Sequence, residues 1–101
     1  MTCTRHFARR VRERIGDSPD PDFLARGLIW AVQNARDDLV QFVCRTDRKG
    51  LRIFRFKAAP TGRVFYALID TETLTCITVM PPGFRVGRQG KDHLQLRSDD
   101  I

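Results

Sequence analysis

The fold is decided by residues 39 to 80, which read LVQFVCRTDRKGLRIFRFKAAPTGRVFYALIDTETLTCITVM. Three turn signals divide this stretch: DRKG at 47–50, APTG at 59–62 and DTET at 70–73. The runs between them are short and rich in β-branched and aromatic residues, which is typical of strands. They predict strands at 39–45, 51–57, 63–69 and 74–80. Four strands joined by tight turns form an antiparallel meander.

Alternation along these strands predicts which side chains share a face. In the first strand Val40, Phe42 and Cys44 alternate with Gln41, Val43 and Arg45. In the second strand Phe54 and Phe56 share a face, whereas Arg52 and Arg55 lie on opposite faces.

A short helix is predicted over residues 4–15, ahead of the strands. Phe7, Val11 and Ile15 recur at helical spacing and form an apolar stripe. Thr4 is a candidate N-cap, and Gly16 follows the last periodic residue, as is common where a helix ends.

A second helix is predicted over residues 22–36, with Asp20 or Asp22 as its cap. Gly27 lowers the helix propensity, so we expect it to permit close packing against a neighbour. Trp30 flanks a broad apolar face that comprises Phe23, Leu24, Leu28, Ala31, Val32 and Ala35.

These elements predict one α+β domain over residues 1–101, with two N-terminal helices packed on one face of a four-stranded antiparallel meander sheet. The helices are expected to bury Phe7, Val11, Phe23, Leu24 and Leu28. The other face of the sheet is expected to be partly open and polar. Residues 84–101 form a C-terminal extension, in which 93–97 can add an edge strand.

Composition excludes several classes of protein. The chain has 101 residues, 42% of them hydrophobic and 30% charged, which suits a folded domain and not a disordered one. It contains no apolar run of the roughly 20 residues that a membrane-spanning helix needs, and no secretory signal. The three cysteines, Cys3, Cys44 and Cys76, lie far apart and predict reduced thiols and a cytoplasmic location. No zinc-type spacing is present, so we expect no metal and no cofactor.

The formal net charge is +6, and 15 of the 18 basic residues are arginine. A guanidinium offers a planar fork of donors that suits phosphate, so RNA or another polyanion is a candidate partner. The basic residues form three sets: one in the first helix, one in the strands (Arg45, Arg48, Lys49, Arg52, Arg55, Lys57 and Arg63) and one near the C-terminus (Arg85, Arg88, Lys91 and Arg97).

His6, Arg10 and Arg14 are spaced i, i+4, i+8 and form one ridge of the first helix. Two arginines can hold a phosphate, and they disfavour protonation of a neighbouring histidine. A neutral imidazole can act as a general base. The alternative is a solvated basic helix face without a catalytic role.

Residues 4–16, TRHFARRVRERIG, resemble the opening of small bacterial domains grouped with the RelE-like ribonuclease toxins. Those domains begin His-x-x-x-Arg-x-x-x-Arg, then Gly and a hydrophobic residue, whereas here Ile15 precedes Gly16. The Val-, Ile- and Thr-rich stretch 75–80 is similar to the last strand of the family, and the resemblance covers about residues 4–82.

The resemblance implies metal-independent RNA cleavage in a bacterial toxin or phage-conflict system, in which the ribose 2′-hydroxyl attacks the adjacent phosphate. His6 would be the base or acid, and Arg10 and Arg14 would hold the phosphate. Arg63 and Tyr66 are candidate helpers from the sheet, and His93 is the other imidazole. The candidate nucleic-acid contacts are Arg5, Arg9, Arg52, Arg55, Lys57, Arg88 and Lys91.

Two other functions fit the same residues. One is a non-catalytic basic module that docks on nucleic acid, or on an acidic protein such as an antitoxin. The other is an interaction protein in which Trp30 and Phe84 anchor a partner or a homodimer.

Overall fold

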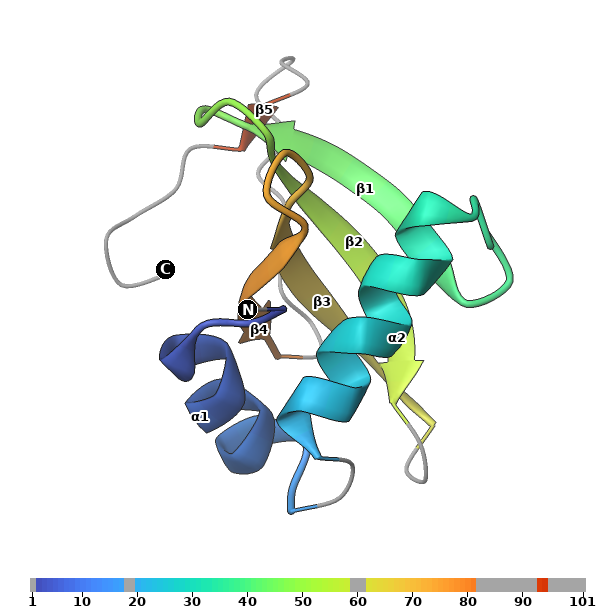
Figure 1. Ribbon diagram of the computed structural model, residues 1–101. Helices are drawn as coiled ribbons and strands as arrows, with labels where there is room; N and C mark the ends of the chain where they lie inside the picture. Colours follow the sequence, from blue (N-terminus) through green and yellow to red (C-terminus); the bar gives the residue numbers. More distant parts are fainter. Residues whose placement is uncertain (1, 18–19, 59–61, 82–92, 95–101) are drawn as a thin grey trace.

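A computed structural model (Figure 1) describes residues 2–17, 20–58, 62–81 and 93–94. Two helices precede the strands, as predicted: α1 (Arg5–Arg14), α2 (Pro21–Gln33), β1 (Val40–Thr46), β2 (Leu51–Ala58), β3 (Arg63–Asp70), β4 (Thr75–Met80) and β5 (His93–Leu94). The α+β class and the antiparallel meander of β1 to β4 are confirmed. The sheet order is β4-β3-β2-β1-β5, and β5 is parallel to β1. Of the strand expected at 93–97, residues 95–97 lie outside the described residues.

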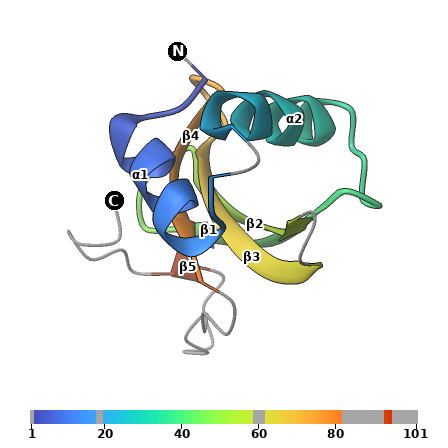
Figure 2. The same ribbon diagram turned by 90° about the horizontal axis from the view of Figure 1, so that it is seen from below.

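Thr4 both starts α1 and attaches it to the sheet. Its hydroxyl accepts a hydrogen bond from the Phe7 N–H at 3.0 Å, which confirms the predicted N-cap. The same hydroxyl donates to the Ile77 carbonyl of β4 at 2.7 Å. The backbone around it continues the attachment through a parallel bridge between Cys3 and Cys76, in which the Thr4 N–H donates to the Cys76 carbonyl and the Cys76 N–H donates to the Thr2 carbonyl. The helix therefore lies beside β4 (Figure 2).

The second helix starts at its predicted cap but ends early. Asp20 accepts from the Phe23 N–H, and Pro21 occupies the first turn, where its missing N–H is harmless. The helix ends at Gln33 and not at residue 36, because Ala35 has a φ of +50°.

Two expectations about α2 are wrong. Phe23 is 74% exposed. It lies nine residues before Val32, which faces the core, and nine residues are two and a half helical turns, so the two side chains lie on opposite sides of the helix. Gly27 is exposed and has no neighbour within 4 Å of where a Cβ would stand, so it permits no close packing.

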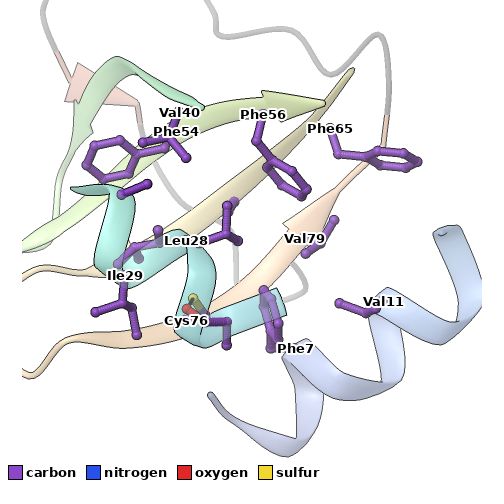
Figure 3. Packing of buried hydrophobic residues seen from close by; sticks show 14 of the residues in the cluster. Phe7, Val11, Leu28, Ile29, Val40, Phe54, Phe56, Phe65, Cys76 and Val79 are labelled. Carbon is purple, nitrogen blue, oxygen red and sulfur yellow. Dashed lines mark hydrogen bonds between the residues drawn. The ribbon is translucent and has the colours of Figure 1, made fainter. Parts of the chain in front are cut away.

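The main core lies between both helices and one face of the sheet, called the helix face here. Figure 3 shows Phe7 and Val11 of α1 and Leu28 of α2 directed toward the sheet. The sheet supplies cross-strand rows, for example Val40, Phe56 and Phe65 from β1, β2 and β3. Phe7 and Val11 have no exposed surface, which confirms the predicted stripe of α1.

The opposite face of the sheet, called the second face here, is not simply open and polar. Its centre is apolar: Ile53 and Leu68 have no exposed surface, and Met80 is 4% exposed. Polar side chains occupy one end of this face, where Gln41, Arg55 and Tyr66 form a cross-strand row. The expectation of a polar second face therefore fails at the centre and holds at that end.

A β-bulge in β1 changes the predicted alternation. Phe42 lies opposite Phe54, Cys44 opposite Ile53 and Arg45 opposite Arg52, so β1 has one extra residue in this stretch. Val43 and Cys44 both pack toward the second face. Cys44 therefore does not share a face with Phe42, whereas Arg45 does. Arg52 and Arg55 lie on opposite faces, as predicted.

Candidate functional site

The ridge of His6, Arg10 and Arg14 forms as predicted, on the part of α1 next to β4. All three side chains are half-buried. The Arg14 guanidinium donates to the Val79 carbonyl on β4. Arg10 forms an ion pair with Glu13, with 2.7 Å between nitrogen and oxygen. Both guanidinium groups thus already have partners within the fold.

The surroundings of His6 favour the neutral form of its imidazole. Its pKa is lowered by burial and, in decreasing order, by Arg10, Arg9 and Arg14, while Glu13 acts in the opposite direction. The Arg9 guanidinium lies 3.4 Å from Nδ1, and a guanidinium can only donate, so this contact assigns the proton to Nε2. Nε2 is buried and has no hydrogen-bond partner among the described residues. The basic nitrogen therefore faces a cation, and the N–H is shielded from solvent.

Arg63 and Tyr66, the catalytic candidates from the sheet, lie on opposite faces of it. Arg63 lies opposite buried Ala58 and its guanidinium is 5.8 Å from the centre of the Phe65 ring, on the helix face. Tyr66 lies between Arg55 and Met80 on the second face. The structure thus brings His6, Arg10 and Arg14 together but places Arg63 and Tyr66 on opposite sides of β3.

The predicted nucleic-acid contacts divide among several surfaces. Arg5 and Arg9 are exposed on α1. Arg52 lies on the helix face of β2, and Arg55 and Lys57 lie on its second face. Arg88 and Lys91 lie outside the described residues, as does Phe84.

The turn joining β1 and β2 concentrates positive charge, of which the site residues chosen from sequence included only Arg52. Arg45 and Arg52 lie directly opposite each other, although like charges in such a cross-strand pair repel. Arg48 and Lys49 lie in the turn between them, and residues 45–52 line a hollow of about 410 Å³. We call Arg45, Arg48, Lys49 and Arg52 the hairpin cations. The sequence contains a signal for this cluster, because Arg45 and Arg52 lie two residues before and two residues after the DRKG turn.

Two carboxylates lie near the hairpin cations, those of Asp47 and Glu72, and Asp47 lies in the same turn and lines the same hollow. Lys49 lies 3.8 Å from the Glu72 carboxylate, which is a long surface ion pair. Within the described ranges, Arg45, Arg48 and Arg52 form no ion pair. By contrast, Arg26 and Arg36 on and after α2 pair with Asp22 and Asp38.

A second hollow of about 480 Å³ lies at the polar end of the second face. Its lining includes Gln41, Arg55 and Lys57, and the Arg55 Nε lies 3.4 Å from the Gln41 side-chain oxygen. His6, Arg10 and Arg14 line neither this hollow nor the hairpin hollow.

The described residues offer little for a metal or a membrane. No group of three or more His, Cys, Asp or Glu residues suited to a metal occurs in the described part of the chain. No described helix is long and apolar enough to cross a membrane. Trp30 is exposed and lies under the Arg36 guanidinium at 5.4 Å.

Comparisons with protein-family models, with curated proteins and with solved structures found no match. The RelE-like resemblance therefore stays a prediction from residues 4–16 and 75–80.

Proposed function

We propose that the protein is a non-catalytic nucleic-acid-binding module that contacts the phosphodiester backbone through the hairpin cations. The observation that carries this proposal is the direct opposition of Arg45 and Arg52 without any carboxylate pairing them among the described residues. Two opposed guanidinium groups are unfavourable in the free protein, and an anion between them relieves the repulsion.

Phosphate suits this hollow better than an isolated carboxylate does. Arginine forks match the geometry of a phosphate, and a polymer of phosphates can engage Arg45, Arg48, Lys49 and Arg52 together.

Salt dependence tests the proposal. Affinity for a fluorescent oligonucleotide is measured by anisotropy at several salt concentrations. If the four hairpin cations contact phosphates, log affinity should fall with log salt with a slope of about −3 to −4. The double variant R45S/R52S should bind more weakly, with a slope smaller by about 1.5 to 2.

A matched variant controls for net charge. R26S/R36S removes the same amount of charge, but from arginines that form surface ion pairs with Asp22 and Asp38. It should change affinity less than R45S/R52S does. Absence of binding at low salt, or equal losses in the two variants, would contradict a hairpin site. Capture of an acidic protein in place of nucleic acid would do the same.

A RelE-like ribonuclease is the second candidate, favoured by the neutral imidazole of His6 among Arg9, Arg10 and Arg14. The binding proposal expects RNA to stay intact in the presence of a chelator. Cleavage that leaves a cyclic phosphate and disappears in His6→Gln would establish the ribonuclease instead. Growth arrest on expression, relieved by the same substitution, would be its cellular counterpart.

A further inference from the structure

Phe42 is an exposed aromatic side chain beside the hairpin cations. It is 53% exposed, although it lies within β1 of the sheet. Its ring meets the Phe54 ring edge-on, with centroids 5.8 Å apart and planes at 67°. Phe54 is buried in the main core, so the Phe42 ring has firm support on one side.

The bulge in β1 brings Phe42 and Arg45 onto the same face. Residues three apart in a regular strand point to opposite faces. Here the extra residue places Phe42 opposite Phe54 and Arg45 opposite Arg52, and those two partners are two residues apart on β2. Phe42 and Arg45 are therefore neighbours on this face, and the backbone positions of their partners Phe54 and Arg52 are roughly 7 Å apart.

A hollow borders this bulged stretch of β1, and residues from both faces of the sheet line it. Phe42, Val43, Cys44 and Arg45 line a hollow of about 300 Å³. Its lining includes an aromatic ring and a cation. A nucleotide offers a partner for each, because a base and its phosphate are joined through one sugar.

We propose that the bound nucleic acid is single-stranded, with one base stacked on Phe42 and its phosphate held between Arg45 and Arg52. In a duplex both faces of each base are covered by neighbouring bases, so a side chain cannot stack on them. In a single strand the bases are free to stack on aromatic rings. Stacking tolerates any base, so this site binds without strong sequence preference. The inference rests on the proposed nucleic-acid binding and adds the class of ligand.

The test compares strands and variants at one salt concentration. Single-stranded RNA, single-stranded DNA and a duplex of the same sequence are titrated against the full chain by anisotropy. Single strands should bind more tightly than the duplex. Phe42→Ala should weaken single-strand binding about ten-fold and leave duplex binding and the salt slope unchanged.

Two further variants make the result specific. Phe42→Leu keeps an apolar side chain but has no π face, so it should lose as much affinity as Phe42→Ala. Because it is the milder change, it still tests the stacking site if Phe42→Ala does not fold. Phe23→Ala removes another exposed phenylalanine, on α2, and should have no effect.

Failure of this inference is distinguishable from failure of the proposed function. Equal affinity for single strands and duplex, with no loss in Phe42→Leu, would overturn the stacking site while salt-dependent binding at the hairpin stands. Absence of binding to every oligonucleotide would overturn both. A preference for RNA over DNA would support the inference and add a contact to the 2′-hydroxyl.

Discussion

Replacing Gly27 by alanine should stabilise the protein. Gly27 lies in the middle of α2, is exposed, and has no described atom outside its own stretch of helix within 4 Å of the position of an added Cβ. Alanine is favoured over glycine within a helix by about 0.8 to 1.0 kcal/mol, largely because glycine leaves the unfolded chain more freedom. No packing loss offsets this gain. For a domain of about 100 residues, 1 kcal/mol corresponds to a rise in Tm of about 4 °C.

Thermal unfolding followed by far-UV circular dichroism measures this effect, and urea unfolding gives the free energy independently. Gly50→Ala is the matched control, because Gly50 has a φ of +82° and its Cβ would lie 3.0 Å from the Glu72 Cγ. It should lower Tm, since an L-residue is strained in this region. A lower Tm for Gly27→Ala would contradict this prediction, because it would mean that this surface of α2 packs against another part of the protein.

Four further predictions follow from the described contacts. Phe7→Ala should destabilise the fold by about 3 to 5 kcal/mol in urea unfolding, because Phe7 has no exposed surface; a loss below about 1 kcal/mol would contradict its place in the core. Arg45→Thr should raise Tm at low salt and less at high salt, because it removes the repulsion from Arg52; an effect independent of salt would exclude this cause. Iodoacetamide should label Cys3 and Cys44 before Cys76 in peptide mapping, because burial raises the pKa of Cys76 to about 12 and leaves no exposed surface; early labelling of Cys76 would contradict this. The lowered pKa of His6 means that the unfolded chain binds its proton more readily than the native state, so Tm should fall as pH drops below about 6.5, and His6→Gln should flatten this fall; parallel pH profiles would argue against it.

Local sequence signals determined most of the fold. Turn residues separate the four strands of the meander, and Gly50 in the DRKG turn adopts the positive φ that only glycine adopts readily. Thr4 and Asp20 cap their helices because each hydroxyl or carboxylate reaches an N–H of the first turn. These features depend on neighbours within a few residues, which a sequence displays directly.

The observed packing differs from the predicted faces at Phe23 and at the bulge in β1. Phe23 is apolar, but helical geometry directs it away from Val32, so the apolar face of α2 does not include it. The bulge at Val43 and Cys44 moved Cys44 to the second face and Arg45 to the helix face, and two successive apolar residues were its only signal in the sequence. Strand register depends on the partner strand, so alternation within β1 could not reveal it.

The candidate sites divide in the same way. Residue order alone sets the basic charge, the ridge of His6, Arg10 and Arg14, and the position of two arginines beside one turn. Long-range contacts then set the surroundings of these groups: Arg14 donates to a carbonyl of β4, Arg63 and Tyr66 lie on opposite faces of the sheet, and Arg45 faces Arg52. The physical reason is that charge and helical spacing are properties of the chain, whereas burial, cross-strand pairing and access to a ligand are created by contacts between residues far apart along it.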